Sequence, residues 1–338
     1  MITYDIAIIG AGPVGLFTVF QAGMLGLKSC VIDTLSFMGG QCSALYPQKP
    51  IYDIPGFSSI AAQELIENLK KQASPFKPKC LLNQQCLDVQ KKDSIWFLKS
   101  SKNTIKAKTI IIAAGGGSFS PRKPPLKDIQ SYENISVFYH IKDKNLFKDK
   151  IVTIAGGGDS ALDWAVALAN GITKKLYLVH RRSDFRAAPN TVKEIRRLCN
   201  LNKIQLVTPY QLDNLKGNKG VLHEIIVKNL DGNILSFRSD YLLPFFGMSM
   251  NIGPINHWGI SIKNKHIEVD PATMQTSLSG VFAIGDICSY PGKLKLILTG
   301  FAEAARACHS AYKIINPDLP LHFEYSTTKG LPGDEENV

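Results

Sequence analysis

Residues 4–33 of this 338-residue chain read YDIAIIGAGPVGLFTVFQAGMLGLKSCVID, and this stretch decides the fold. An apolar run before the first glycine is typical of a strand that is buried on both faces. Gly10, Gly12 and Gly15 follow in G-x-G-x-x-G spacing, then a helix-like run, then a second strand that ends at Asp33. This order predicts a βαβ unit that holds a pyrophosphate at its helix N-terminus and a ribose 2′-hydroxyl at the terminal acid.

The main alternative for this stretch is a transmembrane helix, because no charged residue falls between Asp5 and Lys28. Several glycines and Pro13 interrupt the run, and no basic segment precedes it. We therefore expect neither a membrane span nor a signal peptide. The length of the chain suggests about two domains.

The composition limits the partners and the compartment. The formal net charge of +11 favours an acidic partner, nucleic acid or an anionic membrane surface. The basic residues are scattered rather than massed, so nucleic acid is not indicated. The seven cysteines include no C-x-x-C pair, and their odd number and wide spacing are typical of reduced thiols in a cytoplasmic protein. The sequence shows no cluster of metal ligands.

A glycine-rich segment follows Asp33 and leads to an aromatic residue. It contains Gly39, Gly40 and Gln41, and Tyr46 comes five residues later. We expect a loop here, and if the first unit holds a dinucleotide, this is the next backbone to pass over it. Gln41 would then contact the ligand and Tyr46 would present its ring to it. An ordinary connecting loop is the alternative.

A second strand, turn and helix begin near residue 151. Gly156, Gly158 and Ala161 give G-x-G-x-x-A, and Asp159 and Ser160 open the helix. This order predicts a second dinucleotide-binding unit. A Gly- and Pro-rich stretch at 115–125 precedes it and indicates a domain boundary, and the residues from 247 to 251 are the expected return crossing.

The two units differ at the end of their second strand. The first ends on Asp33, whereas the second is followed by Arg181, Arg182 and Arg186. A carboxylate pairs with a free 2′-hydroxyl, and arginines neutralise a 2′-phosphate, so the first site suits FAD or NAD and the second suits NADP. The alternative is that the arginines are solvated surface charge.

Taken together, these motifs resemble those of the thioredoxin-reductase-like ferredoxin–NADP reductases, a group within the class II pyridine nucleotide–disulphide oxidoreductases. The resemblance extends from Tyr4 to about Lys329. It rests on the motifs GAGPVG at 10–15, GGQ at 39–41, ALYP at 44–47, GGGDSA at 156–161, HRRSDFRA at 180–187, GVFAIGDI at 280–287 and ST at 326–327.

The resemblance implies an α/β fold of two Rossmann-like, three-layer ββα dinucleotide-binding domains, as in thioredoxin reductase. An FAD domain formed by residues 1–117 and 250–338 would be interrupted by an NADP domain at 118–249. The resemblance also implies a homodimer whose C-terminal tail covers the flavin. The redox partner of the protein would be ferredoxin or flavodoxin, which are acidic electron carriers.

The resemblance implies specific ligand contacts. For FAD they are Gly10, Gly12, Pro13, Val14, Gly15, Asp33, Gln41, Tyr46, Cys86, Pro121, Asp286 and Thr327. Among these, Asp286 would hold the ribityl chain. The assignments of Cys86 and Pro121 depend on their positions in the sequence more than on the chemistry of their side chains. Tyr46 and Tyr325 would stack on the two faces of the flavin ring. For NADP the contacts are Gly156, Gly158, Asp159, Ser160, Arg181, Arg182 and Arg186.

One departure from the relatives limits the reaction. Reductases of thioredoxin carry a C-x-x-C just before the second glycine-rich turn, but residues 137–150 contain no cysteine. Dithiol reductases of the glutathione-reductase type carry C-x4-C in the first domain, but Pro47 stands where the partner of Cys42 would be. We therefore expect hydride transfer from NADPH to flavin N5 and then single-electron transfers to ferredoxin, without a catalytic acid or base.

Two alternatives stay open. In the first, the same FAD enzyme serves another acceptor, such as flavodoxin, a quinone or a small disulfide. In the second, the chain is a flavin-bound sensor or interaction protein with little turnover, although a complete NADP half would have no evident purpose there.

Overall fold

The structure is a computed structural model that describes residues 2–141, 143–320 and 330. The chain forms two compact units. Unit 1 contains the described residues up to Ser118 and from Met250 onward, and unit 2 contains those from Phe119 to Ser249. The chain passes between them along β9 (Ser118–Pro121) and β17 (Met248–Asn251), which pair as a two-stranded sheet.

A seven-stranded sheet forms the centre of unit 1. Its parallel strands are β1 (Thr3–Ile9), β2 (Ser29–Ile32), β5 (Lys79–Leu81), β8 (Thr104–Ile112) and β20 (Val281–Ala283). The antiparallel strands β6 (Cys86–Lys92) and β7 (Ile95–Ser100) extend it. The first half of β8 pairs with β7 and the second half with β20, so the sheet forks at β8.

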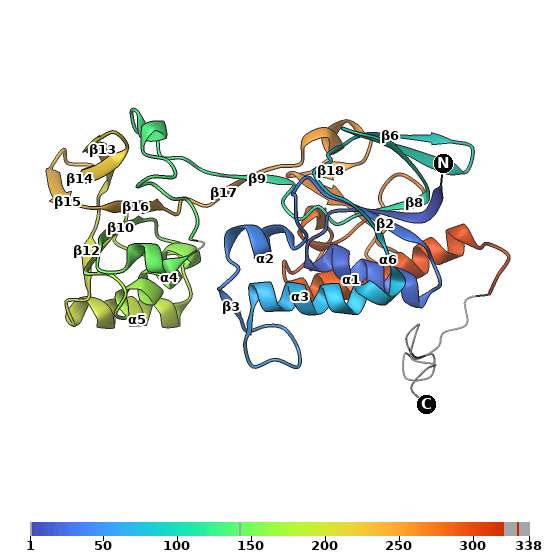
Figure 1. The fold of residues 1–338 in the computed structure, drawn as a ribbon, viewed down its shortest axis with the longest axis horizontal. Coiled ribbons are helices and arrows are strands. Elements are labelled where there is room, and N and C mark those ends of the chain that lie inside the picture. Colours follow the sequence, from blue (N-terminus) through green and yellow to red (C-terminus); the bar gives the residue numbers. More distant parts are fainter. Residues whose placement is uncertain (1, 142, 321–329, 331–338) are drawn as a thin grey trace. The chain divides into compact units, whose positions relative to one another are not determined.

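Three helices pack side by side on the sheet of unit 1: α1 (Pro13–Met24), α3 (Ala62–Ala73) and α6 (Ile297–Ile315) (Figure 1). A Cβ at Gly300 of α6 would lie 2.4 Å from Val14 Cγ2 of α1, so this glycine lets the two helices approach closely. The short elements of unit 1 are α2 (Gly40–Leu45), β3 (Pro50–Ile51), β4 (Ile60–Ala61), η1 (Ser74–Phe76), η4 (Gly253–His257), β18 (Ile262–Lys263), β19 (His266–Glu268), η5 (Gly285–Ile287) and β21 (Cys288–Ser289).

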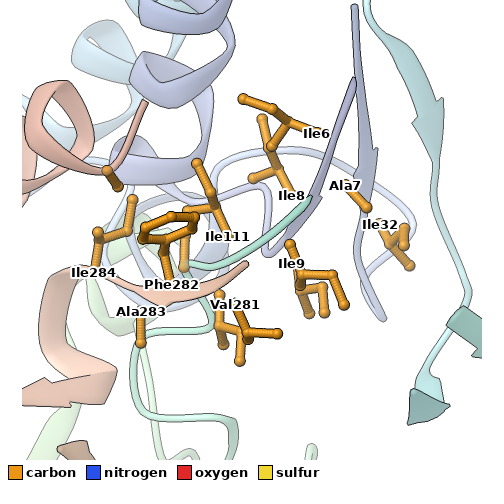
Figure 2. Packing of buried hydrophobic residues seen from close by; sticks show 14 of the residues in the cluster. Ile6, Ala7, Ile8, Ile9, Ile32, Ile111, Val281, Phe282, Ala283 and Ile284 are labelled. Carbon is orange, nitrogen blue, oxygen red and sulfur yellow. The ribbon is translucent and has the colours of Figure 1, made fainter. Parts of the chain in front are cut away.

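The core of unit 1 lies between these helices and the sheet. Ile6 and Ile8 of β1 are fully buried, as the apolar run in the sequence predicts. Phe282 of β20 pairs with Ile111 of β8, and Figure 2 shows its ring in this packed layer beside Ile284. The glycine-rich turn at 10–15 follows directly after β1, and the turn with Gly285 and Asp286 follows β20 after Ile284.

Unit 2 repeats this plan on a smaller scale. Its parallel sheet has the order β12–β11–β10–β16, formed by β10 (Ile151–Ala155), β11 (Lys175–Val179), β12 (Ile204–Val207) and β16 (Tyr241–Pro244). The helices α4 (Asp159–Ala169) and α5 (Pro189–Asn200) pack on one face (Figure 1). The antiparallel strands β13 (Gln211–Asn218), β14 (Val221–Lys228) and β15 (Ile234–Arg238) pack on the other. The turns η2 (Ile129–Ser131) and η3 (Lys144–Phe147) complete it.

One local prediction was wrong. The segment at 39–41 is not a loop, because α2 begins at Gly40, where the positive φ angles of Gly39 and Gly40 let the chain turn into a helix. No helix within the described residues is long and apolar enough to cross a lipid bilayer.

Candidate dinucleotide-binding sites

The first glycine-rich turn is packed against backbone at two of its three glycines. A Cβ at Gly10 would lie 2.3 Å from the Ala113 carbonyl oxygen, and one at Gly15 would lie 1.9 Å from the Gly10 carbonyl oxygen. Both positions therefore exclude any side chain. Gly12 differs, because its φ of −72° suits any residue and no atom lies within 4 Å of its Cβ position. The protein's own packing thus explains Gly10 and Gly15, whereas the space at Gly12 is open.

The N-terminus of α1 starts at this open position. Gly12 is the N-cap, no side chain caps the helix there, and Pro13 occupies the first turn. The first N–H groups of a helix have no partner within the helix, and they favour an anion. A glycine without a Cβ in front of them gives a phosphate direct access to the backbone.

Asp33 is tied to the same turn. Its carboxylate accepts hydrogen bonds from the N–H groups of Ala11, at 2.7 Å, and Leu35, at 2.8 Å. Burial raises the pKa of this carboxyl above its usual range, and these N–H groups oppose that shift. Each carboxylate oxygen offers two lone-pair directions, so both keep the capacity to accept from a ribose hydroxyl.

The short helix α2 begins against the first turn. The Gly39 N–H donates to the Ala11 carbonyl at 2.8 Å, and a Cβ at Gly40 would lie 3.0 Å from the Gly12 Cα. Gln41 follows in the first turn of α2, and its Nε2 lies 3.9 Å from the Cβ position of Gly115, which follows β8. The structure therefore brings α2 to the edge of the turn that carries Gly12.

Cys42 and Tyr46 meet at the end of α2. The Cys42 thiol donates to the Tyr46 hydroxyl at 3.7 Å. Burial raises the pKa of both groups, and the negative charge of Asp286 raises them further. Asp286 itself stands on η5, which follows β20 after Ile284. Its charge thus acts on a pair of residues more than two hundred positions earlier in the sequence.

The other FAD residues implied by the sequence fall into three groups. Cys86 begins β6 and is buried, which raises the pKa of its thiol to about 12. Its strand follows Gln84, whose N–H donates to the Asp33 carbonyl at 2.9 Å. Pro121 ends β9, in the passage between the units. Tyr325 and Thr327 lie outside the described residues.

The glycine-rich turn of unit 2 follows the same construction. A Cβ at Gly156 would lie 2.6 Å from the Phe245 carbonyl oxygen, so the turn is packed there. At Gly158 the nearest atom to a Cβ would be the Arg186 carbonyl oxygen, 3.8 Å away. Gly158, like Gly12 in unit 1, therefore has room for a Cβ and stands at the start of a helix. That helix is α4, whose first residues are Asp159 and Ser160.

The arginine segment after β11 is held against this turn by backbone contacts. The Arg186 N–H donates to the Gly157 carbonyl at 2.8 Å, and the Ala188 N–H donates to the Asp159 carboxylate at 2.9 Å. Arg181, Arg182 and Arg186 are all exposed. Asp159, expected as a ligand contact, therefore also positions the arginine segment.

His180 is a residue of this site that sequence reasoning did not select. Its ring lies over Gly157, where a Cβ would come within 2.2 Å of it, and it stacks on Phe185 with centroids 5.4 Å apart. Burial lowers the pKa of His180 and the nearby arginines lower it further, whereas a hydrogen bond with the backbone of Asp184 opposes this shift. The position of His180 directly before Arg181 and Arg182 in the sequence could have identified it as a residue of this site.

Comparison with known proteins identifies the family. The pyridine nucleotide-disulphide oxidoreductase family matches residues 4–310. The chain belongs to this family. Curated relatives named ferredoxin–NADP reductase occur in Rickettsia felis and Rickettsia conorii, each 55% identical, over 97% and 100% of this chain and 98% and 99% of their own. One from Ehrlichia canis is 52% identical over 98% of both chains. The resemblance that the motifs indicate is confirmed.

Solved structures agree on the fold. Lactococcus lactis thioredoxin reductase matches with a TM-score of 0.79 at 22% identity, covering 93% of this chain and 99% of its own. T. acidophilum thioredoxin reductase also gives 0.79 at 22% identity, covering 92% and 98%. The bacillithiol disulfide reductase Bdr of Staphylococcus aureus gives 0.75 at 16%, also covering 92% and 98%. The predicted thioredoxin-reductase-like α/β fold is confirmed.

Within residues 2–141, 143–320 and 330, no three His, Cys, Asp or Glu side chains form a metal-binding cluster.

The open space at Gly12 leads to a first prediction. Gly12→Ala should leave the unfolding free energy of the apoprotein within about 1 kcal/mol, because the new Cβ meets no protein atom. It should weaken FAD binding about tenfold or more, measured by titrating the apoprotein with FAD and following fluorescence quenching. Gly15→Ala is the matched control and should destabilise the apoprotein itself. Undiminished FAD affinity in Gly12→Ala would contradict a phosphate at this turn.

Proposed function

We propose that this protein is an FAD-dependent ferredoxin–NADP reductase, with FAD in unit 1 and NADP(H) in unit 2. The observation that carries the cofactor assignment is the contrast between the two strand ends. Asp33 is tied to the first glycine-rich turn, and an exposed arginine segment is tied to the second. A carboxylate selects a free ribose hydroxyl and arginines select a 2′-phosphate.

The residues of unit 1 fit FAD. Gly12 leaves room for the pyrophosphate, which Pro13, Val14 and the start of α1 would hold. We assign the other FAD contacts to Gly10, Gly15, Asp33, Gln41, Tyr46, Cys86, Pro121, Asp286, Thr327 and, stacked on the ring, Tyr325. The domain that holds FAD would comprise residues 1–117 and 250–338. FAD supplies the redox chemistry, because it takes two electrons from NADPH as a hydride and returns them singly.

Unit 2 fits NADP(H). The pyrophosphate would lie at the open space of Gly158 and the N-terminus of α4. The 2′-phosphate would lie against Arg181, Arg182 and Arg186. We assign the remaining contacts to Gly156, Asp159 and Ser160, within a domain of residues 118–249. The exposed arginines supply the positive charge of this site.

The acceptor is assigned from the relatives and from the thiols. The similar chains are named ferredoxin–NADP reductase over nearly their whole length. Dithiol relays need paired, reactive cysteines, yet all seven cysteines of this chain lie in its described part and are free. Burial raises the pKa of Cys42 in α2, which disfavours the reactive thiolate. Electrons would therefore pass directly to a one-electron carrier.

Charge would guide the encounter with this carrier. The formal net charge of +11 attracts an acidic protein such as ferredoxin or flavodoxin. Attraction of this kind raises the association rate more than the affinity, and salt screens it.

We also propose a cytoplasmic homodimer. Unpaired thiols are typical of a reducing compartment, and the resemblance of the motifs to the ferredoxin–NADP reductases implies a dimer. Sedimentation equilibrium of the FAD-loaded protein should give twice the mass of one chain. A single-chain mass at micromolar concentration would refute the dimer.

The redox assignment is tested by anaerobic spectroscopy. NADPH should bleach the visible flavin absorption of the FAD-loaded protein, NADH should do so far more slowly, and oxidised ferredoxin should restore it. Ferredoxin reduction should slow as ionic strength rises. Bleaching that ferredoxin cannot reverse would keep the flavoenzyme and exclude ferredoxin as acceptor. A protein that cannot be loaded with FAD would refute the proposal.

The arginines are tested by cofactor preference. Arg181→Ala/Arg182→Ala should raise the KM for NADPH more than about tenfold and narrow its advantage over NADH, since each lost phosphate contact costs about 1.5–3 kcal/mol. Steady-state kinetics with a dye acceptor measure this without ferredoxin. Arg196 is an exposed arginine on α5, so Arg196→Ala is the matched control. It should change neither the KM for NADPH nor the preference for NADPH over NADH. An unchanged NADPH preference in the double variant would contradict the phosphate contact.

A further inference from the structure

Glu303 of α6 carries a buried carboxylate that the proposed function does not use. Its residue is only 1% exposed, within the helix that packs on α1. Glutamate is almost never buried this deeply unless its charge is paired and hydrogen-bonded, because desolvation of an unpaired carboxylate is costly. The partners of Glu303 therefore indicate what the buried charge does.

All four partners of this carboxylate come from one short segment, residues 285–293. Oε2 accepts from the Gly285 N–H at 2.7 Å and from the Cys288 thiol at 3.7 Å. Oε1 accepts from the Tyr290 hydroxyl at 2.5 Å and from the ammonium of Lys293, with which it forms an ion pair. The Lys293 side chain is itself 6% exposed. One carboxylate thus binds residues from 285 to 293, within the segment that joins β20 to α6.

This segment begins at the turn that carries Asp286. Gly285 has a φ of +73°, and its N–H donates to Glu303, while its carbonyl oxygen, 3.2 Å from the Cys288 sulfur, shares the single thiol proton with Glu303. The Cβ position of Gly285 lies 3.6 Å from Val14, in the first turn of α1. The turn is therefore held by α6 through a hydrogen bond and lies next to the first turn of α1.

The helix that carries Glu303 has little freedom to move. At Gly300, one turn before Glu303, α6 meets Val14 so closely that a Cβ would not fit. The same α1 begins at the open space of Gly12. Glu303 on α6 therefore connects the turn that carries Asp286 to α1, whose N-terminus would hold the pyrophosphate.

We propose that Glu303 is a positioning residue of the flavin site, which holds the Gly285–Asp286 turn so that Asp286 can bind the ribityl chain of FAD. This inference rests on the proposed function, because it requires that unit 1 binds FAD. Glu303 does not touch the cofactor in this account. It acts on FAD only through Asp286.

The ionised form of Glu303 is required because its partners are all donors. A carboxylate accepts at both oxygens, whereas the amide of glutamine has one acceptor and one donor. Glutamine would therefore direct an NH2 group either at Gly285 and Cys288 or at Tyr290 and Lys293. Opposed donors leave buried polar groups unsatisfied, and Lys293 would lose its counter-charge. Glu303→Gln keeps the size of the side chain and removes only its negative charge and its ability to accept hydrogen bonds at both terminal atoms.

The test compares FAD affinity in variants of the apoprotein. Glu303→Gln should raise the dissociation constant of FAD about tenfold or more, measured by fluorescence titration. Glu67→Gln is the matched control, because Glu67 also pairs with a lysine, Lys70 at 3.0 Å, but on the exposed side of α3. It should leave the FAD affinity unchanged. Leu98→Ala, a buried truncation in β7, controls for lost stability without a changed turn.

A double-mutant cycle separates positioning from general destabilisation. In an Asp286→Asn background, Glu303→Gln should weaken FAD binding by less than about twofold further, because the group through which it acts has already been altered. An undiminished tenfold effect in that background would overturn the proposal. If Glu303→Gln does not fold, Tyr290→Phe removes one donor and should still raise the FAD dissociation constant about threefold.

The outcomes distinguish this inference from the proposed function. Wild-type protein that binds FAD and reduces ferredoxin, together with unchanged FAD affinity in Glu303→Gln or Tyr290→Phe, would overturn the positioning role and leave the function standing. Wild-type apoprotein that binds no FAD would overturn both. A loss of FAD affinity equal to that of Leu98→Ala at equal loss of stability would also overturn the positioning role.

Discussion

Close backbone contact at the first glycine-rich turn is the constraint on which unit 1 depends. Gly10 meets the carbonyl oxygen of Ala113, and Gly15 meets the carbonyl oxygen of Gly10, at distances that leave no room for a Cβ. This packing joins the ends of β1 and β8 to the start of α1. It also leaves Gly12 facing open space, so that the helix N-terminus is accessible to a phosphate.

Unit 2 repeats the constraint and changes what is attached to it. Its turn is packed at Gly156 and open at Gly158, as in unit 1. In unit 1 a side-chain carboxylate, Asp33, binds the backbone of the turn, whereas in unit 2 the backbone of the arginine segment binds it, through Arg186. The same scaffold thus presents an acceptor in one unit and positive charge in the other, which is the basis for assigning FAD and NADP(H) to different units.

Buried charge is the second organising element of unit 1. Glu303 is fully buried and Asp33 is half-buried, and each is satisfied by groups that set the position of backbone near the proposed flavin site. Asp33 accepts from the N–H groups of Ala11 and Leu35, and Glu303 accepts from the segment that follows β20. Leaving such donors unpaired in a low-dielectric interior would be costly, so the two acids specify geometry as well as charge.

The sequence by itself determined the two βαβ units, because strand and helix periodicity and glycine spacing are local properties that propensity and sterics fix. It also predicted the contrast between Asp33 and the arginines, whose residue types carry the chemistry. It did not predict that α2 begins at Gly40, since a positive φ at two glycines is compatible with a loop or with a helix start. Only the tertiary structure decided that the charge of Asp286 acts on Tyr46 and that Glu303 is buried against Gly285, because packing of β20 and α6 brings together segments that no local pattern relates.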